Sequence, residues 1–183
     1  ISAGNVTAGG STLQAATIVW AAGVEAGPVT RSAGLPVDRG GRLQVLPDLS
    51  LPGHPEIFAI GDIATLTDAK GQKVPGVCPA AIQMGRHVAQ LLQREADHGR
   101  KYLAPLPRPA FTYFDKGSMA TIGRNAAVAE TGSIKARGFI AWLMWLFIHL
   151  LFLVGFRNRL FVFLQWVFSY CTWRRGARLI MKK

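Results

Sequence analysis

Asp62 stands where a carboxylate could bind a ligand. It follows Gly61 and residues 57–60, a run of four apolar residues that predicts a short strand buried on both faces. Because ligands of open α/β sheets bind beyond the carboxyl ends of the strands, Asp62 could accept a hydrogen bond there from a sugar or ribitol hydroxyl. Taken alone, these residues are more simply interpreted as a strand followed by a Gly-Asp turn.

Lysine and cysteine side chains offer fewer clues to chemistry. Lys116 lies between Asp115 and Gly117, where a turn is expected, and a lone lysine in a turn is usually a solvated charge. The two cysteines, Cys78 and Cys171, lie far apart in the sequence, and no Cys-x-x-Cys motif or zinc-type spacing is present. We therefore predict no metal site, and we expect both cysteines to be reduced thiols.

A helix is predicted from Pro79 to about Asp97. Proline suits the first turn of a helix, because the N–H that it lacks would have no partner there in any case. The start of this helix would carry free N–H groups and about half a positive charge, which favours a nearby anion. Small and apolar residues at helical spacing predict the face that packs on the core: Ala81, Gly85, Val88 and Leu92.

The other predicted elements are short. Residues 1–16 predict a weak hairpin with its turn at Gly9-Gly10-Ser11. Strands are expected at four further places, the first of them buried: residues 17–22, 111–114, 119–122 and 126–130. Three stretches rich in glycine, proline or polar residues predict loops, with a small antiparallel excursion in the first: residues 26–55, 65–76 and 100–109.

Positive charge is concentrated at the end of the chain. Residues 1–134 carry 12 Lys or Arg and 10 Asp or Glu, whereas residues 135–183 carry 9 Lys or Arg and no acidic residue. Almost all of the formal net charge of +11 therefore lies in the last 49 residues, which are also the most apolar and hold every tryptophan except Trp20. This combination favours an anionic membrane surface over nucleic acid, which needs basic residues on a polar face.

Two apolar segments lie in this basic region. Residues 139–156 contain one polar side chain, His149, and fall just short of the roughly 20 residues that span a bilayer, and residues 160–173 are shorter. Basic residues flank both segments, which argues against a crossing under the positive-inside rule. We expect two helices in the headgroup zone, and a single span by the first segment is the alternative. The expected interfacial anchors are Trp142, Trp145, Trp166 and Trp173.

Four stretches of the sequence together resemble one protein family. They are residues 17–23 (TIVWAAG), 57–62 (IFAIGD), 111–123 (FTYFDKGSMATIG) and 138–143 (GFIAWL). With them the sequence is similar to the type II (non-proton-pumping) NADH dehydrogenases, which are NADH:quinone oxidoreductases. The resemblance runs over nearly the whole chain, and its most specific part is the segment around Lys116 joined to the apolar tail.

The resemblance implies an α/β fold, namely the C-terminal part of a Rossmann-like flavoprotein with two dinucleotide-binding domains and a C-terminal amphipathic or hydrophobic helical membrane anchor. Residues 1–25 would end the NADH-binding domain, residues 26–134 would form the C-terminal half of the FAD-binding domain, and residues 135–183 would form the anchor. Neither of the family's two Gly-x-Gly-x-x-Gly turns is present and the chain begins with Ile1, so we expect a portion of a longer protein.

The resemblance also implies roles for individual residues. The expected contacts are Gly61, Asp62, Pro79, Ala80 and Lys116 with FAD, Ala22 and Gly23 on the NADH side, and Gln83 and Met119 with quinone. Gln83 and Lys116 would be the catalytic residues, and Lys116 and the helix start at Pro79 would stabilise the negative charge of the reduced flavin. Where the family often has Ala-Gln-x-Ala-x-Gln, this chain has CPAAIQ at residues 78–83, so Pro79 replaces the first glutamine.

The predicted function is FAD-dependent transfer of electrons from NADH to a membrane quinone without proton pumping. The complete enzyme would be a homodimer bound peripherally (monotopically) to anionic lipid on the cytoplasmic face of the cell membrane, without a nucleic-acid partner. One alternative is a flavoprotein resembling the sulfide:quinone oxidoreductases, which need cysteines near the flavin, where only Cys78 is placed. The other is a membrane-bound fragment without activity of its own.

Overall fold

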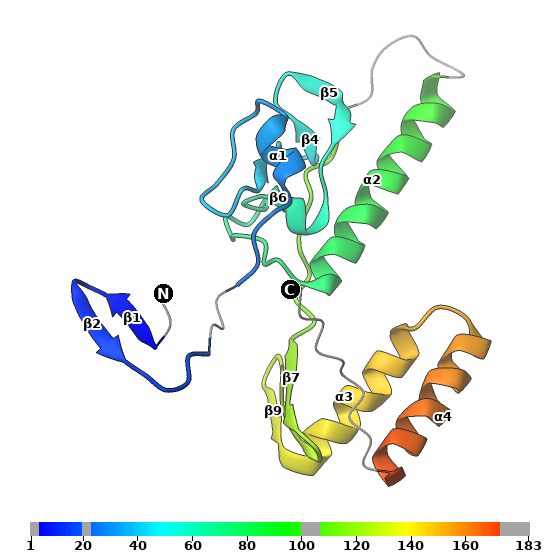
Figure 1. Ribbon diagram of the computed structural model, residues 1–183. Coiled ribbons are helices and arrows are strands. Elements are labelled where there is room, and N and C mark those ends of the chain that lie inside the picture. Colours follow the sequence, from blue (N-terminus) through cyan, green and yellow to red (C-terminus); the bar gives the residue numbers. More distant parts are fainter. Residues whose placement is uncertain (1–3, 20–22, 100–106, 173–183) are drawn as a thin grey trace. The chain divides into compact units, whose positions relative to one another are not determined.

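The computed structural model (Figure 1) describes residues 4–19, 23–99 and 107–172. The chain divides into two compact units, Ile1–Phe114 and Asp115–Lys183, and each has its own hydrophobic core. The domain boundaries predicted after residues 25 and 134 concern the complete protein and stay predictions.

The first described element is the predicted hairpin. Strands β1 (Asn5–Ala8) and β2 (Ser11–Gln14) pair antiparallel, and Gly9 and Gly10 form the turn with φ of 56° and 82°. The buried strand predicted at residues 17–22 is wrong for residues 17–19, which form no strand and expose 82% of Val19. No described strand pairs with these residues, and residues 20–22 lie outside the described part of the chain.

Short elements build the core of the first unit. The helix α1 (Pro28–Ser32) was not predicted, whereas the small antiparallel excursion is confirmed as β4 (Ser50–Leu51) with β5 (His54–Phe58). Strand β3 (Leu43–Gln44) pairs parallel with β6 (Ala64–Thr65). The loop predicted at residues 65–76 as polar also supplies two buried core side chains, Leu66 and Val74.

The strand predicted at residues 57–60 differs from the one observed. β5 ends at Phe58 and pairs only with β4, so within the described chain it is an edge strand. Its side chains are exposed, with Ile57 at 45%, and of the four predicted residues only Ala59 is buried. The prediction of a strand buried on both faces is therefore wrong for this chain, because, of the residues of β5, only Phe58, at its end, packs against the core.

The long helix is confirmed, but its buried face is not the predicted one. Helix α2 spans Cys78–Gly99. The side chains that it buries are Ala80, Met84, Val88 and Leu91. Of the predicted face only Val88 is buried, and Leu92 is 48% exposed. The observed buried face lies about one residue out of phase with the predicted one. Met84 packs in the core cluster with Leu49, Leu66 and Phe111, and Leu91 is buried on the same face of the helix.

The second unit is a three-stranded antiparallel meander with two helices. Strands β7 (Ser118–Gly123) and β8 (Ala126–Thr131) confirm the predicted strands, and β9 (Ile134–Arg137) adds a third. Helix α3 (Gly138–Phe152) packs on β8 through small side chains, and α4 (Phe156–Thr172) returns along α3 (Figure 1). The core residues at the sheet are Ala127, Ala129 and Ala141.

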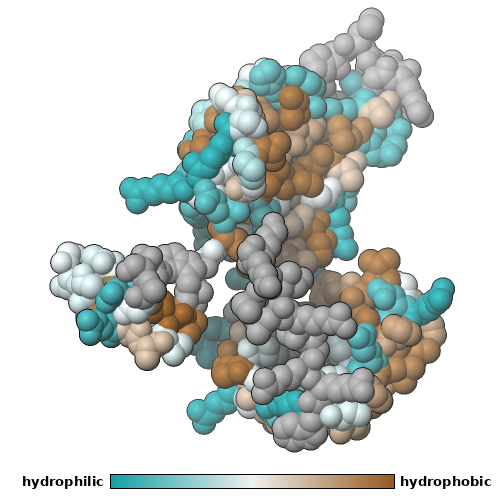
Figure 2. Space-filling model, in the orientation of Figure 1, coloured by the Kyte–Doolittle hydropathy of each residue, from teal (hydrophilic) through white to brown (hydrophobic). Residues whose placement is uncertain are grey.

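The first apolar segment is interrupted. The helix α3 has 15 residues and ends at Phe152, and the turn that follows contains Gly155 with φ of 83°. Among the described residues no helix is long and apolar enough to span a membrane. Both helices still expose many large apolar side chains, among them Phe147, Phe152, Phe156 and Phe161, and hydrophobic residues gather over this part of the molecule in Figure 2.

Candidate functional site

The Gly-Asp turn packs against the start of α2. Residues Gly61–Ile63 form one turn of 3₁₀ helix, η1. Gly61 has φ of 72°, its N–H lies 3.2 Å from the Sδ atom of Met84, and a Cβ at this position would lie 3.4 Å from the Cβ of Ala81. A side chain would therefore be strained by the backbone and crowded by the helix, so glycine is required here for local reasons.

Asp62 is exposed at the tip of this turn. Within the described part of the chain, no hydrogen bond or ion pair engages its carboxylate. An exposed carboxylate beside a bare glycine backbone is available to accept hydrogen bonds from a bound molecule. The turn thus has the form that the sequence predicted, although the strand before it is not buried.

The first turn of α2 lies next to η1. Pro79 is half-buried, and Ala80 is only 2% exposed because its side chain belongs to the core. The N–H groups of Ala80 and Ala81 both donate to the carbonyl of Val77, at 3.0 and 3.1 Å. The positive field of the helix start, rather than a hydrogen bond from the amide of Ala80, is what this turn can offer an anion.

Gln83 is held by the main chain of Phe114. Its Nε2 donates to the carbonyl of Phe114 at 2.9 Å, and its Oε1 accepts the N–H of Phe114 at 2.9 Å. A side-chain amide carries the same donor and acceptor pair as a peptide group, so Gln83 pairs with Phe114 as a neighbouring strand would. The side-chain amide of Gln83 retains one further N–H and one further lone pair for a ligand.

The strand predicted at residues 111–114 is absent, because these residues bond to side chains and to a loop instead of to another strand. The N–H of Phe111 donates to the carbonyl of Pro47 at 2.8 Å, and the N–H of Tyr113 to the carboxylate of Asp68 at 3.4 Å. These residues are anchored, but their partners are the loop main chain at Pro47 and Ala69 and two side chains rather than another strand. The prediction of a strand here is wrong, although the segment is fixed to the core through Phe111.

Asp68 organises the turn beside this segment. Its Oδ1 accepts the N–H groups of Lys70 at 2.9 Å and Gln72 at 3.0 Å, in addition to the bond from Tyr113. The hydrogen bond from Gln72 is the largest cause that lowers the pKa of Asp68, and with those of Lys70 and Tyr113 it outweighs the opposing effect of burial. Asp68 was not among the predicted residues, although Asp68 with Gly71 three residues later is a recognisable turn signature.

Arg108 ties the same segment to its surroundings. Its Nε lies 2.7 Å from Glu95 Oε1, its Nη1 lies 3.1 Å from Asp48 Oδ2 and 2.7 Å from the carbonyl of Pro55, and its guanidinium lies 5.1 Å from the centre of the Phe58 ring. The Glu95 hydrogen bond raises the pKa of Arg108. Burial alone would raise the pKa of Asp48, but the hydrogen bonds from Ser50 and Arg108 lower it on balance.

Lys116 and Met119 belong to the second unit. The Nζ atom of Lys116 lies 5.6 Å from the centre of the Phe152 ring. Gly117 beside it has φ of 93°, and a Cβ there would lie 2.1 Å from the carbonyl oxygen of Glu130, so glycine is required in this turn. Met119 is half-buried and packs against the small core between β8 and α3.

The structure brings some of the predicted site residues together. Gly61 and Asp62 adjoin the helix turn of Pro79 and Ala80, whereas Lys116 and Met119 are described only within their own unit. On the predicted NADH side, Gly23 is exposed and lies outside any strand, and Ala22 lies outside the described residues. The predicted roles of all nine site residues remain proposals.

Two protein families match this chain. Residues 2–85 match the family described as pyridine nucleotide-disulphide oxidoreductase, and residues 116–175 match the NDH2 C-terminal domain. Gly61 and Gln83 lie in the first matched stretch, and Lys116 opens the second. These matches confirm the α/β class and the resemblance stated from the sequence.

The chain also resembles complete proteins. It is 42% identical to the type II NADH:quinone oxidoreductase Ndh of Mycobacterium tuberculosis over 172 residues, which are 92% of this chain and 35% of that protein. It is 40% identical to NdhA of the same organism over 92% of this chain and 35% of the relative. With the mitochondrial internal alternative NAD(P)H-ubiquinone oxidoreductase A1 of Arabidopsis thaliana it shares 32% identity, over 88% of this chain and 34% of the relative.

A solved structure shares the fold. The structure of NDH2 from Plasmodium falciparum in complex with NADH matches with a TM-score of 0.71 at 16% identity, over 92% of this chain and 47% of that chain. The chain spans only about a third of the length of the curated relatives that it matches, with 35% of Ndh as the example.

Proposed function

Since this chain belongs to the type II NADH dehydrogenase family, we propose that the complete protein transfers electrons from NADH through FAD to a membrane quinone. The observation that carries this proposal is the turn at Gly61 and Asp62. Gly61 has no Cβ, the turn is packed on the start of α2, and Asp62 presents an exposed carboxylate that no described residue engages.

The residues of this turn fit a flavin cofactor. Asp62 would accept hydrogen bonds from a ribitol or ribose hydroxyl, and the bare backbone at Gly61 would allow the cofactor to approach closely. Pro79 and Ala80, at the start of α2, and Lys116 would supply positive potential toward the cofactor. When bound, FAD would supply the capacity to accept a hydride and to pass on two electrons.

The remaining predicted residues would meet the two substrates. Ala22 and Gly23 would lie on the NADH side, and Gln83 and Met119 on the quinone side. Gln83 would hydrogen-bond to a quinone oxygen with the donor capacity that its pairing with Phe114 leaves over. Pro79 cannot provide the second side-chain amide that the family often has, so Gln83 would carry this contact alone.

Several exposed apolar residues around the turn suit an incomplete domain. Ile57, Ile60 and Ile63 are 45%, 37% and 37% exposed, and they lie in β5, in η1 or directly between the two. Such a patch suits burial against another part of a flavin-binding domain. In our proposal, the rest of the complete protein covers this patch and supplies the phosphate-binding turns.

The apolar helices would hold the protein on the membrane surface. α3 and α4 expose large apolar side chains, and residues 135–183 carry nine basic and no acidic residues. These features suit monotopic binding to anionic lipid on the cytoplasmic face, where quinone in the lipid would be within reach. A homodimer rests on the family resemblance alone, and light scattering of the purified complete protein would test it.

The proposal is tested on the complete protein that carries this chain. We expect the purified protein to show the visible absorption of one flavin per chain, to be bleached by NADH without oxygen, and to regain its colour on addition of a quinone. Flavin reduction without reoxidation by quinone would contradict the quinone step. Reduction by sulfide but not by NADH would favour the sulfide-oxidising alternative, and absence of flavin would favour an inactive fragment.

A further inference from the structure

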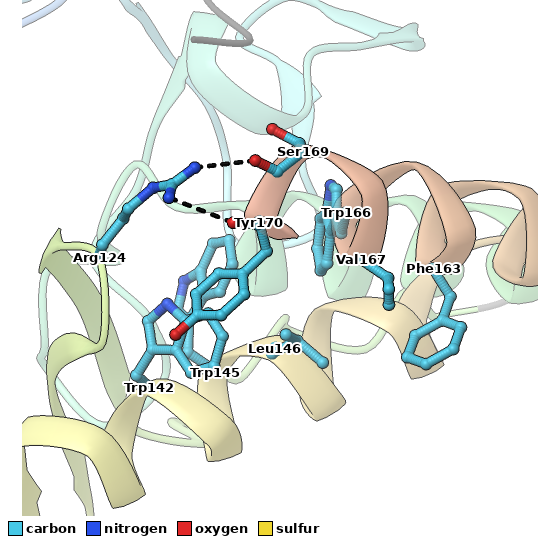
Figure 3. Close-up of a pocket in the computed structure, with 9 residues that line it drawn as sticks. All are labelled: Arg124, Trp142, Trp145, Leu146, Phe163, Trp166, Val167, Ser169 and Tyr170. Atoms are coloured by element: carbon cyan, nitrogen blue, oxygen red, sulfur yellow. Dashed lines mark hydrogen bonds between the residues drawn. The ribbon is translucent and has the colours of Figure 1, made fainter. Parts of the chain in front are cut away.

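A pocket of about 290 Å³ opens between α3 and α4, entirely within the second unit (Figure 3). Its walls are almost all apolar: Trp142, Trp145 and Leu146 come from α3, and Trp166 and Val167 come from α4. The pocket has about twice the volume of an apolar cavity of about 150 Å³ that binds benzene. It is therefore large enough for a segment of a hydrocarbon chain, although it lies just below the usual range of about 300–1,000 Å³ for whole small-molecule ligands.

Aromatic contacts between the two helices hold these walls in place. The rings of Trp145 and Trp166 stack with their centres 5.7 Å apart and their planes at 22°, and the centre of the Trp142 ring lies 5.5 Å from that of Tyr170. The three tryptophans are half-buried. Because ring contacts join α3 to α4 at two places, the pocket is a preformed feature of the helix pair.

The polar groups at one end of the pocket are engaged by the protein itself. Arg124, from the turn between β7 and β8, donates to the carbonyls of Ser169 at 2.8 Å and Tyr170 at 3.3 Å, as the dashed lines in Figure 3 show. Its guanidinium lies 5.5 Å from the centre of the Tyr170 ring, and the hydroxyl of Tyr170 donates to Asn125 at 2.5 Å. We therefore assign no ligand headgroup to these residues.

The walls of the pocket favour hydrocarbon over water. An ordered water needs two to four polar partners, and walls built almost entirely of indole rings and aliphatic side chains offer few of them. A pocket left empty would lose the dispersion contacts of the atoms that line it. A segment of hydrocarbon chain would restore these contacts and remove apolar surface from water.

The outward side chains of the same two helices indicate where such a chain would come from. Phe147 on α3 and Phe161 on α4 are 61% and 70% exposed, and Figure 2 shows hydrophobic residues gathered over this part of the molecule. In the membrane attachment proposed above, such side chains would meet the acyl chains of phospholipids. An acyl chain is therefore the hydrocarbon that the pocket would encounter there.

We propose that this pocket binds one acyl chain of a membrane phospholipid and does not distinguish between headgroups. This goes beyond attachment to a membrane surface, because one chain enters between α3 and α4 at a single site. It rests on the proposed membrane attachment for the source of the chain, and it is independent of flavin and quinone chemistry. A protein that failed to bind vesicles could still retain one lipid in detergent, so the two proposals can fail separately.

The test uses a zwitterionic lipid, so that general attraction of a basic chain to anionic lipid makes no contribution. The full chain is purified in a non-ionic detergent, and native mass spectrometry follows retention of added palmitoyl-oleoyl phosphatidylcholine. We expect retention to saturate at one lipid per chain. Dihexanoyl phosphatidylcholine should be retained about tenfold less, because its shorter chains bury fewer methylene groups. Equal retention of the two lipids, or many adducts without saturation at one, would overturn the proposal.

Matched substitutions separate the pocket from the rest of the apolar surface. Leu146→Trp fills the pocket from α3, whereas Leu143→Trp makes the same change on the same helix at a residue that is 45% exposed and does not line the pocket. We expect Leu146→Trp to lower retention about tenfold, as loss of a bound chain segment would, and Leu143→Trp to leave it unchanged. Equal retention by these two variants would show that the lipid binds outside the pocket and would refute the proposal.

A second pair keeps the test decisive if circular dichroism shows that Leu146→Trp is unfolded. Val167→Phe fills the pocket from α4, whereas Val154→Phe makes the same change at a residue that is 88% exposed in the turn between the helices. The same difference is expected between these two variants, and its absence would refute the proposal in the same way.

Two further comparisons test the identity of the ligand. Palmitoyl-oleoyl phosphatidylethanolamine has the same acyl chains and should be retained within about twofold of the phosphatidylcholine, and a larger difference would show that the headgroup determines binding. An equimolar long-chain quinone should lower the retention of phosphatidylcholine by less than half. A loss of half or more would show that the pocket accepts a quinone tail at least as well as an acyl chain, and it would likewise refute the proposal.

Discussion

At the scale of single residues, Gln83 shows a constraint that its sequence position does not reveal. The family resemblance assigns it to quinone, but its amide forms two hydrogen bonds of 2.9 Å with the main chain of Phe114. A residue that replaces Gln83 would therefore lose these two hydrogen bonds as well as the proposed contact with quinone. The effects of a substitution on stability and on quinone have to be measured separately.

The substitution Gln83→Leu in the complete enzyme should raise the KM for quinone about three- to tenfold, since one hydrogen bond is worth about 0.5–1.5 kcal/mol. Reduction of the flavin by NADH should keep its rate in stopped-flow measurements. Gln93→Leu is the control, because Gln93 lies on the same helix and bonds only to Asp97 among the described residues. A slower hydride step in Gln83→Leu would move this residue to the nicotinamide side.

Asp62 gives a cleaner test, because no described residue engages its carboxylate. Asp62→Ala in the complete enzyme should weaken FAD binding about tenfold or more, since the loss leaves a buried cofactor hydroxyl without its acceptor at about 1–3 kcal/mol. The flavin content after extensive dialysis measures this. Asp97→Ala on α2 is the control, and unchanged flavin content in Asp62→Ala would mean that Asp62 is only a turn residue.

At the scale of elements, residues 107–114 are held without regular secondary structure. Arg108, Asp68 and Gln83 provide the fixed points, at 2.7 Å to Glu95, 3.4 Å to the N–H of Tyr113 and 2.9 Å to Phe114. The segment leads directly to Lys116, so its anchoring would limit where that lysine can go. Two further predictions concern these fixed points.

Arg108→Ala should lower the free energy of unfolding of the first unit by about 1.5–3 kcal/mol, the usual value for losing a hydrogen bond to a charged group. It leaves both Glu95 and Asp48 without their cation. Urea denaturation of the full chain measures the change. Arg86→Ala is the control, because Arg86 is exposed on α2, and its effect should stay within about 0.5 kcal/mol. Equal effects of the two substitutions would refute the anchoring role.

Asp68 should make the stability of the first unit depend on pH. Its pKa in the folded chain lies below the ordinary value of 3.8, chiefly because of the Gln72 N–H, so its contribution is complete at pH values well above 3.8 and is lost as the pH falls through the folded-state pKa. Asp68→Asn should lower the thermal midpoint at pH 7 and reduce the difference between pH 6 and pH 3. Asp97→Asn should change neither quantity, and an unchanged pH profile in Asp68→Asn would contradict the prediction.

The sequence predicted those elements whose signals are local. Gly9-Gly10 marked the first hairpin, Pro79 marked the start of α2, and the strands at residues 119–122 and 126–130 were found. The failures depend on partners distant in sequence. Residues 111–114 pair with side chains instead of a strand, and only Phe58 of β5 packs against the core. Periodicity within one segment cannot show either fact.

The structural roles of the candidate site residues could be predicted only where they depend on neighbours in the sequence. The positive φ of Gly61 belongs to its own turn, whereas its close approach to α2 involves Ala81, which lies 20 residues later. The structural tasks of Gln83 and Asp68 depend on Phe114 and Tyr113, which lie 31 and 45 residues later. Trp142, Trp145 and Trp166 line a pocket between α3 and α4 and Trp173 lies outside the described residues, so their role as interfacial anchors stays a prediction.

At the scale of the whole molecule, apolar residues and basic charge coincide in residues 135–183, which include α3 and α4. Side chains such as Phe139, Phe152 and Phe156 are 53%, 60% and 80% exposed, which is unusual for a face in contact with water. Neither helix, within the described residues, could span a membrane. The exposed apolar side chains support our proposal that these helices lie in the plane of the membrane interface.

We therefore expect the complete protein to bind vesicles of anionic lipid without crossing them. High salt should weaken the association but not abolish it, because the basic residues contribute about 1 kcal/mol each near the surface while burial of phenylalanine and leucine is insensitive to salt. Deletion from Gly138 onward should give a protein that remains in the supernatant, oxidises NADH with a soluble acceptor and reaches membrane quinone poorly. Sedimentation with vesicles at low and high salt measures the binding.

Topology decides between this arrangement and a single span by residues 139–156. With Cys78 and Cys171 replaced by serine, one new cysteine is placed after Lys183 and, in a second variant, one replaces Lys135. Both should react with an impermeant maleimide in sealed inverted vesicles, where the cytoplasmic face is outside, and neither should react in vesicles of the opposite orientation. Reaction at only one of the two positions would mean that the chain crosses the bilayer between them. A crossing would require α3 and the turn at Gly155 to form one continuous apolar span of about 20 residues.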